Sequence, residues 1–94
     1  MIANVVSGRV QPGADEGVVR EQLIPAFRGT PGYRGGYWLR EPDGDQVLAV
    51  TLWESEEALG AALGAAAVQA AIAQTSAMFV GGPQLALYRL VAQG

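Results

Sequence analysis

The sequence predicts an α+β fold in which four strands and two helices follow one another in the order β-α-β-β-α-β. Two observations predict it: apolar, β-branched runs alternate with segments of helical period, and turn signals rich in Gly and Pro separate them. This order gives a ferredoxin-like, four-stranded antiparallel sheet with two helices on one face. We expect a single domain over residues 1–94, because two domains in a chain of 94 residues would each be too short to bury a stable core.

The first strand is expected over Ile2–Val10, an apolar run that ends at the turn signal QPG. A helix is expected from Ala14, because Asp15 and Glu16 lie where a helix N-terminus favours negative charge and apolar residues then recur every four positions. Pro25 lies inside this helix and cannot donate its amide, so we expect a kink or an early end there.

The second and third strands are expected over Tyr33–Arg40 and Val47–Trp53, joined as a hairpin by the turn EPDGD. Gly35 and Gly36 indicate a bulge or a close approach of the backbone within the second strand. Both tryptophans and two of the three tyrosines lie in this hairpin. We expect much of the apolar area of this hairpin to cover a partner chain.

The second helix is expected to begin after Ser55, a favourable N-cap that is followed by two glutamates. It is expected to run as one alanine-rich helix to about Ala77, and the segment VGGP ends it. The fourth strand is expected over Leu85–Val91.

The strands are apolar on both alternating sets of positions, which is unusual for a sheet that has helices on one face only. In the third strand one set is Val47, Ala49 and Trp53, and the other is Leu48, Val50 and Leu52. A single chain would therefore expose an apolar patch larger than soluble monomers usually tolerate. We expect a homodimer in which two copies pack sheet against sheet about a two-fold axis.

The composition excludes several classes of function. The chain has no cysteine and no histidine, so thiolate sites, disulfides and the commonest metal ligand and general base are absent. The net charge is −3, which disfavours nucleic acid as a partner. The longest apolar run is too short and too interrupted to cross a bilayer, and the N-terminus does not read as a signal peptide. We therefore expect a cytoplasmic protein with no membrane and no nucleic-acid partner.

Two stretches, PGYRGGYWLREPDG and VTLWESEEA, resemble the antibiotic biosynthesis monooxygenase family of dimeric α/β-barrel proteins. The resemblance extends from the first strand to the fourth. It implies a pocket between the sheet and the helices, lined by an asparagine of the first strand and a tryptophan at the end of the third. The matching positions are Asn4 and Trp53, our candidate catalytic residues. The haem-degrading branch of the family requires a histidine on the second helix. This chain has none, which argues against haem degradation. The branch that acts on aromatic polyketides uses no metal or flavin, so the resemblance implies no metal and no cofactor.

The resemblance implies a cofactor-independent monooxygenase that acts on a small aromatic or polyketide-type substrate. Such a substrate supplies its own electrons to dioxygen once it is deprotonated, and the protein stabilises the oxyanion and excludes water. The candidate substrate-binding residues are Tyr33, Arg34, Tyr37 and Tyr88. Each assignment has a structural alternative: Asn4 can satisfy a neighbouring backbone group, Trp53 can fill a corner of the core, and Arg34 can pair with a glutamate.

Two other functions fit the same fold. One is a non-catalytic homodimer that binds a small molecule or serves a structural role. The other is a cofactor-free isomerase or cyclase that uses the same pocket for proton transfer. A cavity lined by both Asn4 and Trp53 would favour an enzyme, whereas a solid core at that place would favour the non-catalytic protein.

Overall fold

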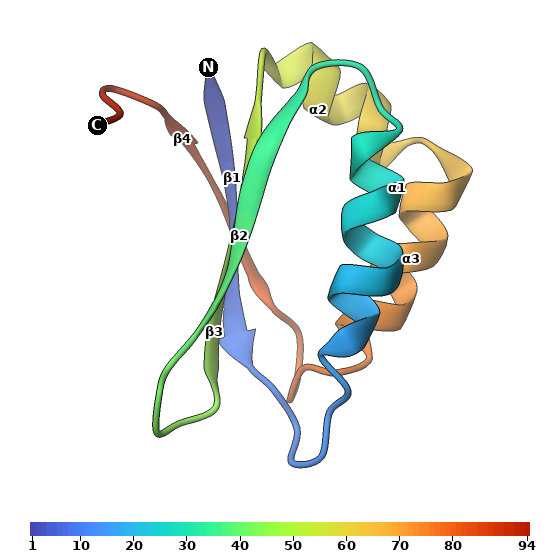
Figure 1. Cartoon of the computed structure of the whole chain (residues 1–94), viewed down its shortest axis with the longest axis vertical. Coiled ribbons are helices and arrows are strands. Elements are labelled where there is room, and N and C mark those ends of the chain that lie inside the picture. Colours follow the sequence, from blue (N-terminus) through green and yellow to red (C-terminus); the bar gives the residue numbers. More distant parts are fainter.

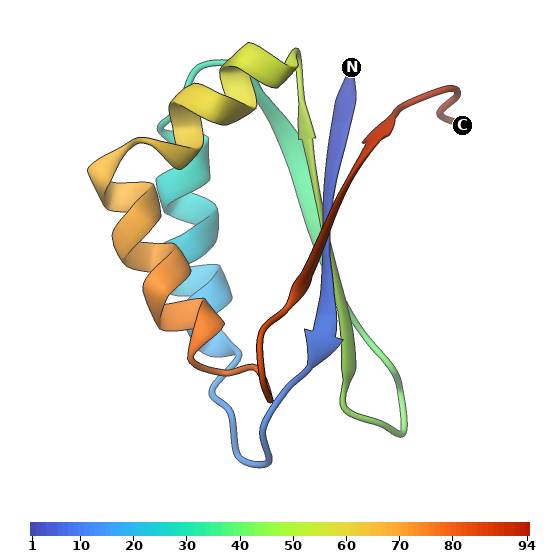
Figure 2. The same ribbon diagram turned by 180° about the vertical axis from the view of Figure 1, so that it is seen from behind.

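The computed structural model describes all 94 residues and confirms the predicted α+β, ferredoxin-like fold (Figure 1). The strands are β1 (Ile2–Arg9), β2 (Tyr33–Arg40), β3 (Gln46–Trp53) and β4 (Gln84–Arg89). They form one antiparallel sheet in the order β2-β3-β1-β4. The helices are η1 (Val19–Leu23), α1 (Ile24–Arg28), α2 (Glu56–Leu63) and α3 (Ala66–Ser76). All of them lie on one face of the sheet, and the other face, which we call the open face, carries no helix (Figures 1 and 2).

The first helix does not end at Pro25 but continues to Arg28. The irregularity that proline imposes takes the form of a π-helical turn immediately before it. In this turn the amide of Ile24 donates to the carbonyl of Val19, five residues back. A wider turn relieves the clash that a proline ring makes with the carbonyl four residues earlier, and Pro25 has no amide to place.

The second helix was expected to be continuous, and this prediction is wrong because the helix breaks between Leu63 and Ala66. Gly64 closes α2, Ala65 takes an extended conformation, and the two helix axes differ by 79°. The helix breaks here because glycine weakens a helix interior and because the two halves pack against different elements. The α2 helix contacts β3, whereas α3 packs against η1 and α1. The predicted N-cap is confirmed, since Ser55 Oγ accepts from the amide of Ala58 at 3.1 Å.

The hairpin of β2 and β3 has the predicted bulge, a register shift between Tyr33 and Gly35, where Gly35 takes a φ of +113°. The fourth strand is shorter than expected and ends at Arg89. It pairs with β1, which begins at Ile2, so the residues after Leu90 have no strand to pair with.

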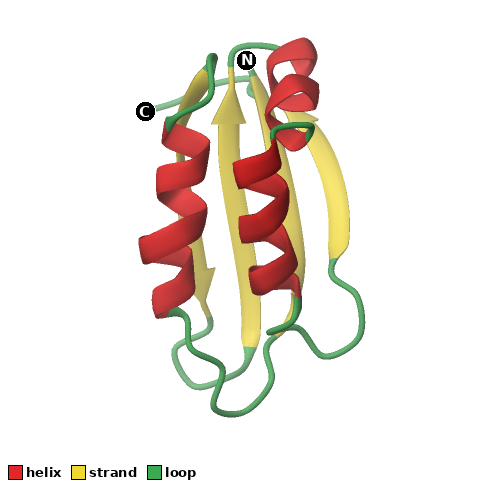
Figure 3. Cartoon of the chain, turned by 90° about the vertical axis from the view of Figure 1, so that its right-hand side faces the viewer, coloured by secondary structure: helices red, strands yellow, loops and turns green.

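The core lies between the helices and the strands β1, β2 and β3. Its buried residues form two clusters, a large one around Trp53 and a small one of Val10, Val47 and Phe79. In Figure 3, α1 lies in front of the β2 side of the sheet, α3 lies in front of its middle, and β4 lies at the opposite edge, beside α3. All six residues of β4 are exposed. The helix-facing side of the sheet is therefore covered at β2 and β3 and accessible at β4.

No helix is by itself long and apolar enough to cross a membrane. Only α2 and α3 taken together meet that test of length and composition, and they are bent by 79°.

Candidate functional site

Asn4 lies at the centre of the helix-facing side of the sheet. The strand register places it in one row with Gly36, Thr51 and Leu87, which belong to the other three strands. The side chain of Asn4 is half-buried, and its amide makes no hydrogen bond within the chain. Leu87, its neighbour on β4, is 52% exposed. The Asn4 amide is thus a polar group on an apolar surface that is accessible from the β4 side.

Trp53 lies one row away and is fully buried, with an exposed fraction of zero. Its ring contacts Phe27 and Tyr33 edge to face, with ring centroids 5.4 and 5.2 Å apart. Its indole Nε1–H donates to Thr51 Oγ1 at 2.9 Å. The tryptophan therefore fills the core behind the site and is shielded from solvent by its neighbours.

The space between the first helix and the hairpin is almost filled. A cavity of about 30 Å³ remains there, and its lining includes Val19, Leu23, Phe27, Trp38 and Thr51. This volume corresponds to roughly one water molecule. Asn4 is not part of the lining. An aromatic ring could occupy this cavity only if side chains moved, whereas the surface around Asn4 and β4 is accessible without such movement.

The structure separates the predicted substrate-binding residues from one another. Tyr33 stacks on Phe27 in the core, and burial raises the pKa of its hydroxyl, an effect that the nearby charge of Arg28 opposes. Arg34 forms an exposed ion pair with Glu54.

Tyr37 and Tyr88 project from the open face, on the side of the sheet opposite to Asn4. Both are exposed, at 60% and 57%. The structure therefore brings only Tyr33 close to Trp53 and brings none of the four residues to Asn4.

The model of the antibiotic biosynthesis monooxygenase family matches residues 1–74. The chain belongs to this family. A search of curated proteins found no match.

Solved structures agree on the fold. SnoaB from Streptomyces nogalater, described as a cofactor-independent oxygenase, superposes with a TM-score of 0.83 at 20% identity, over 98% of this chain and 94% of that one. Rv0793 from Mycobacterium tuberculosis gives a TM-score of 0.80 at 16% identity, over 98% and 96%. A protein from Bordetella bronchiseptica gives 0.81 at 24% identity, over 97% of each chain. At these identities the likeness establishes the fold.

Two features of this monooxygenase-family chain were not predicted as parts of a site. Thr51 is the only polar residue between Val47 and Trp53, and that isolation was the signal that could have identified it. Glu16 was interpreted only as a charge that favours the helix N-terminus. No sequence spacing could have shown that it reaches β2.

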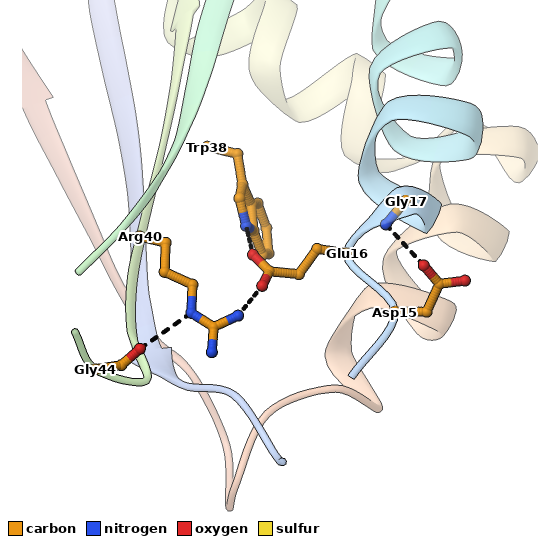
Figure 4. Close-up of polar contacts among 6 residues, drawn as sticks. All are labelled: Asp15, Glu16, Gly17, Trp38, Arg40 and Gly44. Carbon is orange, nitrogen blue, oxygen red and sulfur yellow. Dashed lines mark hydrogen bonds and ion pairs between the residues drawn. The ribbon is translucent and has the colours of Figure 1, made fainter. Parts of the chain in front are cut away.

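Glu16 joins the first helix to the hairpin (Figure 4). Its carboxylate accepts from Trp38 Nε1 at 2.7 Å through Oε2 and from the Arg40 guanidinium through Oε1. Arg40 also donates through Nε to the carbonyl of Gly44 at 3.1 Å. This cluster lies between the first helix and the sheet, at the end nearest the EPDGD turn (Figure 4). No group of three or more acidic side chains in the chain is arranged to hold a metal ion.

Proposed function

We propose that this protein is a cofactor-independent oxygenase of small phenolic aromatics or polyketide-type molecules, with Asn4 as the donor to the substrate oxyanion. The observation that carries the proposal is the Asn4 amide, which lies on a half-buried residue, is accessible to solvent and makes no hydrogen bond within the chain. Binding sites place a few accessible polar groups within a largely apolar surface, so an accessible amide with no partner in the chain is suited to a ligand. Membership of the monooxygenase family and the description of SnoaB support the same activity.

The reaction needs no redox group from the protein. Anthrone, taken as a model substrate, loses a proton to give an enolate. The enolate transfers one electron to dioxygen, and the resulting carbon radical and superoxide combine at the carbon that lost the proton. The peroxide takes a proton back, and loss of water then gives the quinone. One anthrone and one dioxygen therefore give one anthraquinone and one water.

The Asn4 amide stabilises the enolate oxygen in this scheme, as oxyanion-hole donors do. Apolar residues of the same face, Ile2, Val6, Leu85 and Leu87, supply a surface on which a flat ring can lie. Trp53 fixes the floor of the site from within the core. The chain has no histidine, so water or a carboxylate removes the proton.

A second copy of the chain is the proposed partner. The open face carries apolar side chains from all four strands: Val5, Tyr37, Leu39, Leu48, Val50, Ala86 and Tyr88. Sheet-to-sheet packing about a two-fold axis would remove this surface from water.

The activity is tested by incubation of the protein with anthrone under ¹⁸O₂. The proposal predicts anthraquinone that carries one ¹⁸O atom and forms faster than in buffer alone. Asn4→Ala should reduce the rate of this reaction by about 10²-fold, the effect of removing one oxyanion donor. Ser7→Ala, a change on the same strand but on the opposite face, should leave the rate unchanged. Equal rates for the wild type, Asn4→Ala and buffer would remove the oxygenase from consideration.

A non-catalytic binding or structural dimer is the second candidate. The full burial of Trp53 and the small size of the cavity favour it, since neither leaves room for a substrate between helix and sheet. This candidate predicts that Asn4→Ala changes no turnover. The isomerase alternative predicts exchange of solvent deuterium into the substrate without uptake of oxygen.

A further inference from the structure

Thr51 occupies a position between the two residues that the family resemblance singles out. It lies directly across from Asn4 on the neighbouring strand and on the same face of the sheet. Side chains opposite one another in such a pair have Cβ atoms roughly 5 Å apart. Thr51 also lines the small cavity, and Trp53 Nε1 donates to its hydroxyl at 2.9 Å.

The hydrogen bond from Trp53 determines what the threonine hydroxyl can do. A hydroxyl has one proton and two lone pairs, and here the indole occupies one lone pair. The proton of Thr51 has no acceptor within the chain, so the hydroxyl remains free to donate. A hydroxyl that already accepts a hydrogen bond is also polarised toward donating one. Trp53 therefore both fixes the side-chain oxygen and strengthens the free O–H.

The strand on the other side of Thr51 leaves room for it. Gly36 is its partner on β2, and a Cβ at Gly36 would lie 3.2 Å from the Thr51 methyl and 2.6 Å from the carbonyl of Val50. The row across the sheet therefore has no side chain at Gly36 and two adjacent polar side chains, Thr51 and Asn4.

We propose that the Thr51 hydroxyl is a second donor to the substrate oxyanion, beside the Asn4 amide, and that Trp53 is a positioning residue that acts through Thr51. The ligand is a phenolate or enolate oxygen on a flat ring. This inference rests on the proposed function, but it assigns the tryptophan a role that its full burial permits. The ring of Trp53 does not touch the substrate, and its N–H determines the orientation of a group that does.

The test measures how strongly the site prefers a phenolate over a phenol, with 4-nitrophenol as the probe. Its two forms differ in visible absorbance, so the pKa of the bound probe can be read directly without turnover. Two donors should lower the pKa of the bound probe below that of the free one. Thr51→Val should raise the pKa of the bound probe by about one unit, roughly a tenfold loss of phenolate preference. Thr51→Ser should keep the wild-type value.

A double variant separates this role from a structural one. Thr51→Val alone leaves the buried Trp53 N–H without an acceptor, which destabilises the fold. Adding Trp53→Phe removes that unpaired donor, so the double variant should recover stability but retain the tenfold loss of phenolate preference. Thr75→Val is the matched control, because it removes the hydroxyl of another threonine, which bonds only to carbonyls of its own helix.

The possible results are distinguishable. A probe that binds the wild type as phenolate, and binds Thr51→Val equally well, overturns the role of Thr51 and leaves the Asn4 site standing. A return of phenolate preference together with stability in the double variant overturns it as well, because the threonine would then act only through folding. Failure of the wild type to bind the phenolate overturns both this inference and the proposed function.

Discussion

Glu16 holds the first helix to the sheet through a single half-buried carboxylate. Its two oxygens accept from two side chains of β2, Trp38 and Arg40 (Figure 4). The indole N–H of Trp38 is partly buried, so loss of its acceptor would leave an unpaired donor. The bond to Arg40 is more exposed and contributes less.

Glu16→Gln should lower the free energy of unfolding by about 1 kcal/mol, because the amide keeps an acceptor for Trp38 but loses the charge-assisted bonds. Denaturant unfolding followed by circular dichroism measures the change. Asp15→Asn removes the same charge one residue earlier, where the side chain accepts only from the amide of Gly17. Asparagine can accept that bond too, so this control should change stability by less than about 0.5 kcal/mol. Equal losses for both variants would contradict the role given to Glu16.

Tyr33 makes stability depend on pH at the alkaline end. Burial raises the pKa of its hydroxyl in the folded state, whereas the unfolded chain loses this proton near pH 10. Above about pH 10 the folded state therefore binds more protons than the unfolded state, and stability falls as the pH rises. Tyr33→Phe should reduce this fall, and wild-type stability measured between pH 8 and pH 11 provides the reference. Parallel curves for the two proteins would show that the burial of Tyr33 has no such effect.

The β2–β3 hairpin depends on glycine at Gly36, because a side chain there would meet the backbone of β3. A methyl group there would lie 2.6 Å from the carbonyl of Val50, which belongs to the backbone and cannot move away cheaply. Gly36→Ala should therefore lower the free energy of unfolding by roughly 1–3 kcal/mol. Gly60→Ala, on the exposed side of α2 with no atom within 4 Å, should instead raise it by up to about 1 kcal/mol. Thermal unfolding of the two variants side by side measures both signs, and a stable Gly36→Ala would contradict the close approach.

The elements that the sequence predicted well are those with strong local signals. Apolar runs predicted the hairpin strands, two adjacent glycines predicted their bulge, and a residue with a good capping side chain predicted the Ser55 cap. All three features are present. The break at Gly64 was missed because both halves of the helix are rich in alanine. The spacing of small residues along a helix does not reveal that its two halves pack against different elements. The π-helical turn depends on how Pro25 is accommodated, which local sequence does not determine.

The candidate site was predicted less completely than the fold. Sequence placed Asn4 and Trp53 on the first and third strands, and the register puts both on the helix-facing side. Sequence could not show that Trp53 is fully buried or that Thr51 connects it to Asn4, because both facts depend on side-chain packing between elements. Tyr37 and Tyr88 were grouped with them by residue type, but their strand positions place them on the open face.

The whole molecule has two apolar surfaces and helices for only one of them. On the open face Leu39 is 49% exposed and Leu48 is 40% exposed, although both belong to strands in a sheet with a well-packed opposite side. A second copy would cover both side chains. The proposed assembly therefore explains why the alternation of apolar and polar residues fails in these strands.

Leu48→Arg should prevent this assembly, because it would place a charge within the covered surface. Leu63→Arg is the matched control: Leu63 is similarly exposed, at 38%, but lies on α2 on the helix side. We expect the first variant to elute as a single chain in size-exclusion chromatography and the second to elute as the wild type does. The same elution volume for both would contradict the placement of the interface on the open face.

Sedimentation equilibrium of the wild-type protein at micromolar concentration tests the burial of the open face most directly. We expect a mass of twice the 9.8 kDa of one chain. A folded species of 9.8 kDa that shows no association as its concentration is raised would contradict it.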